Sequence, residues 1–146
     1  MSTFDADELL NMQAEGSMET RYTPCPEGEW PAYVSKLEGR SGESEKGPWT
    51  VLDVTWTVTA PEVIQELGVD EPKVRQSIFL EFNEAGQLAM GKGKNVRLGR
   101  LREAVGQNGA GPWAPGNLEG ASAIVRVGHR EYQGDTYAEV TAVSAA

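Results

Sequence analysis

Apolar and polar residues alternate most regularly in the segment Trp49–Ala60, WTVLDVTWTVTA. One face would carry Leu52, Val54, Trp56 and Val58, and the other would carry Asp53, Thr55 and Thr57. Side chains of a strand point to opposite faces in turn, and β-branched and aromatic residues favour strands. The pattern therefore predicts a strand with one buried and one polar face, which is typical of an antiparallel sheet.

Four other segments show the strand pattern, namely Glu29–Glu38, Lys73–Asn83, Ala121–His129 and Thr136–Ser144. The last two flank Tyr-Gln-Gly-Asp at positions 132–135, which predicts a hairpin turn. The polar, Gly-rich segment Gly39–Pro48 follows the first strand and predicts a mobile hairpin loop.

Helical spacing replaces alternation after the third strand, where apolar residues lie at Val96, Leu98, Leu101, Ala104 and Val105. This spacing predicts a helix that Asn95 caps and that ends at Gly106. A short helix is also expected within Pro61–Glu71, and a loop over Asn108–Gly120.

The order of elements is strand, strand, strand, helix, strand, strand. A helix between the third and fourth of five antiparallel strands is the order of the OB-fold, a mainly β barrel. A β-sandwich with one helix is the alternative. The 146 residues suit one domain, here predicted over residues 27–146. Residues 1–26 are acidic, hold few large apolar residues and predict a partly mobile arm, with a helical turn or two at Asp5–Met12 capped by Asp5 or Asp7.

Charge is unevenly distributed along this chain, whose net charge is −9. Residues 72–102 carry seven bases and two acids, whereas the remainder is acidic. Five of those bases lie in Met90–Arg102, a stretch that contains no acid. Because an acidic chain does not need bases for solubility, this cluster indicates an anionic partner.

The sequence offers little for catalysis or for metal binding. Cys25 and His129 are the only residues of their types, which excludes an internal disulfide and a zinc site of cysteine and histidine ligands. Asp53 and Glu81 fall on the polar faces of neighbouring strands, where solvated side chains are expected rather than an acid–base pair. The prediction is a protein that is not an enzyme and holds no metal or other cofactor.

Two further features bear on location. No apolar run approaches the roughly 20 residues of a membrane-spanning helix. The first residues, MSTFDADELL, are acidic and lack the pattern of a signal peptide. We therefore expect no membrane association and a cytoplasmic location.

Several segments between Glu27 and Val143 form a recognisable series: GEWPAYVSKLE, WTVLDVTWTV, FLEFN, KNVRLGRLREAVG, LEGASAIVRV and GDTYAEVTAV. Three features distinguish the series. They are the opening Gly-Glu-x-x-x-x-Val, the predicted helix with Leu98-Gly99, Leu101 and Ala104-Val105-Gly106, and the pattern Gly-x-x-x-x-Val-x-Val in the fourth strand. In this order they resemble a group of bacteriophage single-stranded DNA-binding proteins. The resemblance implies an OB barrel that coats single strands during phage replication or recombination. Many single-strand binders recruit partners through an acidic C-terminal tail, whereas this sequence ends in Val-Ser-Ala-Ala and is acidic near its N-terminus.

Binding of single strands requires cations for the phosphates and flat faces for the bases. The candidate phosphate ligands are Lys92, Lys94, Arg97, Arg100, Arg102, Arg75, Arg40, Lys46 and Arg130. For any one helix arginine a solvated position is the simpler interpretation, and it is the cluster that favours anion binding. Because the helix must turn its apolar residues to the barrel, we expect the Gly-rich lysine loop to contact DNA more than the helix does.

The candidates for base stacking are Phe79, Trp49 and Tyr132. Phe79 falls on the polar face of the third strand with Arg75, where either a base would stack or a loop would cover the ring. The other tryptophans are expected in the core (Trp30 and Trp56) or as a cap on the barrel (Trp113).

The leading hypothesis is sequence-tolerant binding of single-stranded DNA in phage replication or recombination. The alternative is a phage structural or assembly protein that acts through protein–protein contacts, and a weaker alternative is a binder of duplex DNA or RNA. The acidic arm of residues 1–26 is expected either to compete for the binding groove or to recruit a replication or recombination protein. A homo-oligomer is compatible with these functions.

Overall fold

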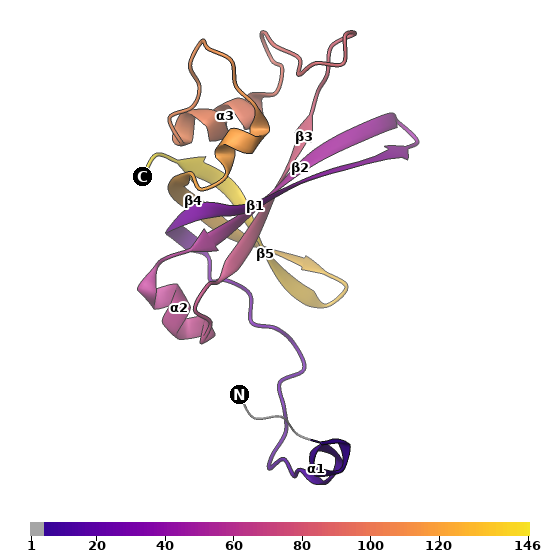
Figure 1. Ribbon diagram of the computed structural model, residues 1–146, viewed down its shortest axis with the longest axis vertical. Helices are drawn as coiled ribbons and strands as arrows, with labels where there is room; N and C mark the ends of the chain where they lie inside the picture. Colours follow the sequence, from indigo (N-terminus) through magenta and orange to yellow (C-terminus); the bar gives the residue numbers. More distant parts are fainter. Residues whose placement is uncertain (1–4) are drawn as a thin grey trace.

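The computed structural model describes residues 5–146 (Figure 1). Its elements are α1 (Ala6–Asn11), β1 (Gly28–Ser44), β2 (Gly47–Val58), α2 (Pro61–Leu67), β3 (Lys73–Leu80), α3 (Val96–Ala104), the 3-10 turn η1 (Pro115–Leu118), β4 (Ser122–Tyr132) and β5 (Asp135–Ser144). The five predicted strands are confirmed. Residues 1–4 of the predicted arm lie outside the described residues.

The strands form a closed barrel in the order β1-β2-β3-β5-β4, in which β4 pairs with β1. Neighbouring strands are antiparallel except β3 and β5, which run parallel where Arg75 lies opposite Glu139. The prediction of a wholly antiparallel barrel is therefore wrong at this seam, because a closed ring with an odd number of strands must contain one parallel pair. The result is a mainly β, OB-fold-like barrel, and its closure rules out the two-sheet sandwich.

The barrel interior is filled by the apolar face that the alternation predicts. Val54, Trp56 and Ile78 are fully buried, and the indole of Trp56 donates a hydrogen bond of 3.0 Å to the amide oxygen of Gln76. Each large side chain buried in this way contributes about 1.5–3 kcal/mol. Helix α3 adds Leu98 and Leu101 to the same core, which fixes the direction in which its other residues point.

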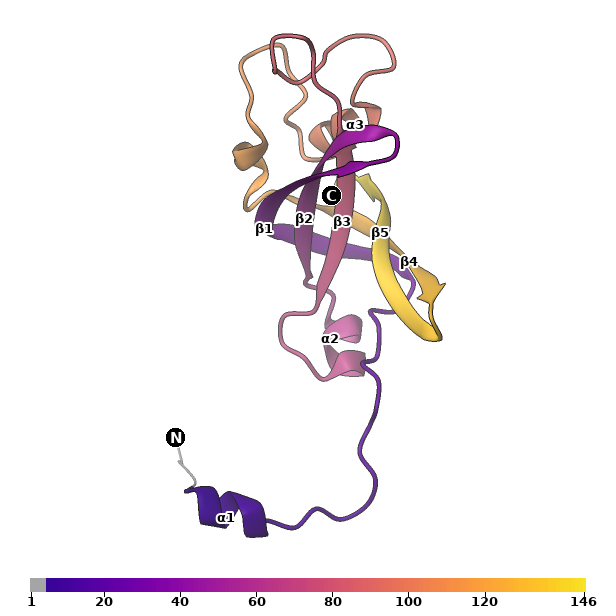
Figure 2. The same ribbon diagram turned by 90° about the vertical axis from the view of Figure 1, so that its right-hand side faces the viewer.

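The segment Gly39–Pro48 is a hairpin, as predicted, but most of its residues belong to strands β1 and β2 and not to a loop. Strands β1 and β2 form a long hairpin of residues 39–52, which we call the finger. Its outer part, residues 42–49, continues beyond the barrel as a two-stranded ribbon, whereas residues 50–52 still pair with β3 (Figures 1 and 2). A Cβ atom at Gly42 would lie 2.6 Å from Cζ2 of Trp49, so only glycine leaves room for the ring there. The glycines that suggested a loop instead allow Trp49 to pack across the ribbon.

Asn95 does not cap α3, although the sequence predicts it. Its backbone is left-handed (φ 48°), and its side chain makes no capping bond to this helix. The side chain instead accepts from the Glu81 N–H at 2.8 Å and donates to the carbonyl oxygens of Glu81 and Ala89 at 2.9 Å each. Asn95 therefore closes the loop of residues 81–95 onto the end of β3.

The β4–β5 hairpin turns at Gln133 and Gly134, as predicted. Both residues have positive φ, 50° and 83°, which is the geometry of a tight hairpin turn that matches the twist of the strands. In Figure 1 this hairpin and the finger project from the same side of the barrel. They are positioned to form the two walls of a site.

The acidic arm leads away from the barrel (Figure 2). Asp5 caps α1 by accepting from the Glu8 N–H at 2.8 Å, as predicted. All residues of α1 are exposed, and the chain joins the packed core at Cys25. The arm lies at the opposite end of the molecule from the loop of residues 81–95.

Candidate nucleic-acid interface

A groove of about 680 Å³ lies between the finger and the β4–β5 hairpin, over the seam where β3 meets β5. Four arginines and one acid are the charged side chains of its lining. We call it the cationic groove, and it is lined by Arg40, Arg75, Ser77, Arg97, Arg130, Tyr137, Ala138, Glu139, Val140 and Thr141. An excess of positive charge in one concave surface of an acidic protein is an anion-binding arrangement.

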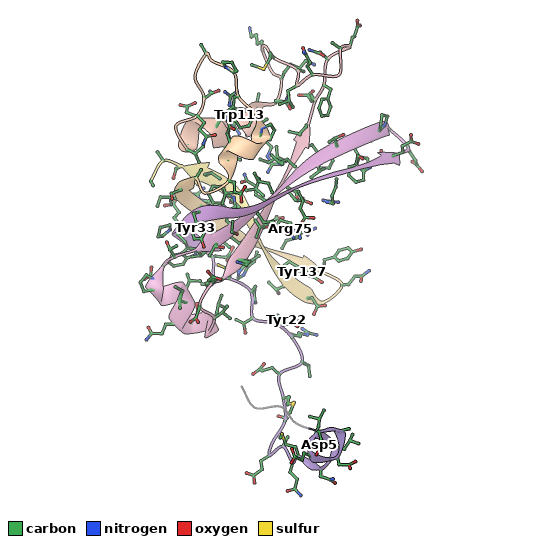
Figure 3. The ribbon with its side chains drawn as sticks, viewed as in Figure 1. Asp5, Tyr22, Tyr33, Arg75, Trp113 and Tyr137 are labelled. Carbon is green, nitrogen blue, oxygen red and sulfur yellow. The ribbon has the colours of Figure 1, made fainter. Side chains whose placement is uncertain are left out.

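Each arginine reaches the groove from a different element. Arg75 points outward from β3 because its neighbours Val74 and Gln76 point into the barrel. Arg97 is exposed on α3 because Leu98 and Leu101 turn to the core. The finger supplies Arg40 and β4 supplies Arg130. Residues far apart in the sequence thus converge only through closure of the barrel, and Figure 3 shows Arg75 on the side from which both hairpins project.

Arg40 is held by a buried carboxylate. Its guanidinium forms an ion pair with Asp53, whose side chain is 5% exposed, and the Ser77 hydroxyl donates to the same carboxylate at 2.7 Å. The hydrogen bond from Arg40 lowers the pKa of the Asp53 carboxyl from its ordinary value, and the bond from Ser77 adds to this, while burial acts in the opposite direction. The prediction that Asp53 is solvated is therefore wrong, because the finger folds Arg40 over it.

The remaining groove arginines are less constrained. Arg130 lies 3.8 Å from Glu139, and both side chains are about half exposed. Arg75 and Arg97 form no ion pair with any residue of the range 5–146. Exposed pairs contribute only about 0–1 kcal/mol, so three of the four guanidinium groups are available to an incoming anion.

A smaller hollow of about 80 Å³ extends the cationic groove along α3. It shares Arg97 and Thr141 with the groove and adds Arg100. The cationic surface therefore runs from the β4–β5 hairpin past β3 to the helix. The helix turns Arg97 and Arg100 toward this surface, whereas the sequence favoured the lysine loop over the helix as the part that contacts DNA.

Aromatic side chains lie beside the groove. Phe79 is 64% exposed on the outer face of β3, and no loop covers it within residues 5–146. Its ring packs edge-on against Trp49 with centroids 6.4 Å apart, and the Arg40 guanidinium lies 5.8 Å from the Trp49 ring. The rings of Trp49 and Phe79 meet at 68°, so they form an aromatic corner beside Arg40, and the exposed Phe79 ring offers a face on which a base can stack.

Sequence reasoning missed Tyr137, which lines the groove from β5 and is labelled in Figure 3. Tyr137, Glu139 and Thr141 occupy alternate positions of one strand, and all three line the groove. The signal was therefore present in the sequence, because Tyr137 interrupts the polar face of its strand as Phe79 does on β3.

The other candidates lie outside the cationic groove. Lys92 and Lys94 belong to the loop of residues 81–95, where Lys94 lies 3.9 Å from Glu81. Lys46 and Tyr132 lie at the tips of the two hairpins. The tips therefore extend both walls of the groove, whereas the lysine loop forms a separate surface near α3.

The side chain of Arg102 stabilises the fold and does not line the cationic groove. Its guanidinium stacks on Trp113 at 4.3 Å from the ring centroid and donates two hydrogen bonds to the Gln107 carbonyl, at 2.9 and 3.1 Å. The indole of Trp113 donates to the side-chain oxygen of Gln107 at 2.7 Å and packs against the core. Trp113 thus covers one end of the barrel, and Arg102 supports it from outside.

Groups suited to catalysis are not brought together. Asp53 contacts Arg40 and Ser77, whereas Glu81 lies beyond the end of β3, so these two carboxylates do not form a pair. Burial raises the pKa of the Cys25 thiol to about 11, which leaves it protonated at neutral pH. The ring of His129 contacts only the backbone carbonyl of Cys25, at 2.6 Å.

Residues 5–146 contain no cluster of three or more His, Cys, Asp or Glu side chains arranged to hold a metal ion. Within the same residues, no helix is long and apolar enough to cross a membrane. Comparison with protein-family models and with curated proteins gave no match. The geometry of the groove is therefore the observation that bears most directly on function.

Proposed function

We propose that this protein binds single-stranded DNA with little sequence preference, in the cationic groove. The observation that supports this most is the convergence of Arg40, Arg75, Arg97 and Arg130 from four elements onto one groove. Phosphates would lie along these arginines, since cations that neutralise a strand release its condensed counterions.

Bases would stack on the aromatic surface of Trp49 and Phe79 and on Tyr137. Stacking tolerates any sequence because every base has a π face, and each stacked base contributes about 1–3 kcal/mol. In a duplex the faces of the bases are already covered by neighbouring base pairs, so the exposed Phe79 ring favours a single strand over a duplex. Following the resemblance, we place this activity in phage DNA replication or recombination, in the cytoplasm of the host cell.

The test is a titration of labelled oligo-dT at several salt concentrations. Wild-type protein should bind tightly at low salt, and its affinity should fall steeply as salt rises. The variant Arg75→Ala/Arg97→Ala/Arg130→Ala should show a log–log salt slope smaller by about 2, because each single-strand phosphate contact contributes about 0.7. Absence of binding at low salt would contradict the proposal.

The matched control is Arg21→Ala/Lys36→Ala/Arg126→Ala, which removes the same charge from exposed ion pairs outside the groove. Its salt slope should equal that of the wild type. If the salt slope falls by the same amount in both triple variants, the attraction is non-specific and the groove is not the site. Competition among oligo-dT, duplex and RNA of equal length then identifies the preferred strand.

A further inference from the structure

Helix α1 exposes every apolar side chain that it carries. Leu9 and Leu10 are 61% and 80% exposed, and Met12 at the C-terminal cap is also exposed. A helix of six residues is marginal in water, because its few hydrogen bonds do not offset the cost of nucleation. A short acidic helix with leucines on its surface is therefore suited to packing against another surface.

A second groove with the complementary character lies at the other end of the molecule. It has a volume of about 210 Å³ between the loop of residues 81–95, α3 and Trp113. Apolar side chains line it, including Leu88, Met90, Val96 and Leu98, and Met90 and Val96 are exposed at its rim. Its charged lining residues are Lys94 and Arg102, and no acid lines it. We call it the terminal groove.

We propose that α1 of one copy of the chain packs into the terminal groove of a second copy. Leu9 and Leu10 would cover the apolar lining, as an amphipathic helix does in a hydrophobic groove. Asp7 lies in the first turn of the helix, three residues before Leu10 and therefore on the same side of the helix, where it would face the positive charge of Lys94. The segment of residues 5–20 contains five acids and no base. The arm is therefore negative and the lining of the terminal groove is positive, so the two surfaces attract each other.

The path of the arm favours a contact between copies. Arg21 donates to the Gly134 carbonyl at 3.0 Å and lies 3.5 Å from the Asp135 carboxylate, so the arm leaves the barrel at the β4–β5 turn. The terminal groove is at the opposite end, beyond the barrel (Figures 1 and 2). An arm directed away from its own terminal groove is available to the groove of a neighbour.

This contact does not involve the cationic groove, and it does not require DNA. If the proposed function also holds, copies joined in this way would occupy adjacent sites on one strand. The second copy would then bind partly intramolecularly, at a raised effective concentration. Self-association without DNA tests the contact alone, whereas the oligo-dT titration tests the function alone.

The experiment is sedimentation velocity of the full chain without DNA, over the widest soluble range of concentration. The sedimentation coefficient of the wild type should rise with concentration. Leu9→Ser/Leu10→Ser should weaken association by more than about tenfold, because the apolar contacts of both leucines with the terminal groove are lost. The control Val69→Ser changes an exposed apolar residue that lies outside both grooves and should behave as the wild type.

Charge reversal identifies the receiving surface. Lys94→Glu should weaken association, and Asp7→Lys in the same chain should restore it, because the pair is then attractive again with opposite signs. A wild type that sediments as a monomer at every concentration would overturn the proposal, and so would association that Lys94→Glu leaves unchanged. An arm folded onto its own barrel would give the first of these results.

Discussion

The two walls of the cationic groove each hold an arginine against a carboxylate, but the two pairs differ in burial. Arg40 of the finger pairs with Asp53, which is almost fully buried and also accepts from Ser77. Arg130 of the β4–β5 hairpin pairs with Glu139, which is about half exposed. The first pair is built into the fold, whereas the second is a surface contact.

The difference in burial means that Arg40 is fixed before a ligand binds, whereas Arg130 can change its partner. The buried carboxylate of Asp53, which accepts hydrogen bonds from both Arg40 and Ser77, holds the Arg40 side chain in one direction and so reduces the entropy lost on binding. An exposed pair contributes little and can dissociate at low cost, so Arg130 can exchange Glu139 for a phosphate. We infer that the finger is the fixed wall of the groove and the β4–β5 hairpin is the adaptable one.

The largest expected effect is on stability. Asp53→Ala should lower the free energy of unfolding by about 2 kcal/mol, because it removes charge-assisted hydrogen bonds and leaves the Ser77 hydroxyl without its acceptor. Glu139→Ala should lower it by less than about 0.5 kcal/mol. Urea denaturation of both variants measures the contrast, and equal losses would show that the two walls do not differ.

The next effect concerns base stacking on the fixed wall. Phe79→Ala should weaken binding of oligo-dT by about 1.5 kcal/mol, roughly tenfold in Kd, with an unchanged salt slope because no charge is lost. Phe82→Ala is the control, since Phe82 is also exposed but lies beyond the end of β3. The stacking role would be rejected if the two substitutions had the same effect on Kd.

A pH dependence should follow from the buried carboxylate. The pKa of Asp53 lies lower in the folded chain than in the unfolded chain, so its contribution to stability is complete above the unfolded pKa, about 4. It is lost as the pH falls through the folded pKa. The difference in unfolding free energy between wild type and Asp53→Ala should stay constant from about pH 7 to about pH 5, and should narrow below about pH 4. A constant difference down to acid-induced unfolding would show that the pKa is not lowered.

The smallest effect is expected on the adaptable wall. Glu139→Gln should tighten binding of oligo-dT by about threefold, because it removes the acid that competes with phosphate for Arg130. Glu29→Gln removes an acid paired with Arg126 outside the groove and should change Kd less. Weaker binding by Glu139→Gln would indicate that this acid holds Arg130 in place, as Asp53 holds Arg40.

The strands could be predicted because their signal is local. The alternation of Leu52, Val54 and Trp56 with polar residues requires only that one face be buried, and the barrel core provides that burial. The continuation of both strands into the finger could not be predicted. A glycine-rich segment usually indicates a loop, and Gly42 fits a strand here only because Trp49 packs across the ribbon against it. Helix capping by Asn95 failed for a similar reason, since its amide is used by the loop that returns from β3.

The arginines of the candidate site were predicted one by one, but their grouping and the part played by β5 were not. Arg40, Arg75, Arg97 and Arg130 were each selected from the sequence, yet the basic stretch at 90–102 appeared to be the centre of the site. The structure divides that stretch among the groove, the terminal groove and the support of Trp113. Such a division depends on which face of α3 meets the barrel, and charge clustering along the sequence carries no information about it.

The parallel seam between β3 and β5 has a consequence for the order of folding. Arg75 and Glu139 face each other across it although 63 residues separate them in the chain, whereas the β1–β2 and β4–β5 hairpins form from neighbouring segments. Contacts between distant residues form late, because the entropy of closing a long loop must be overcome first. The cationic groove spans this seam, so under the proposed function a bound strand of DNA would hold together two edges that meet late in folding, and it would slow unfolding.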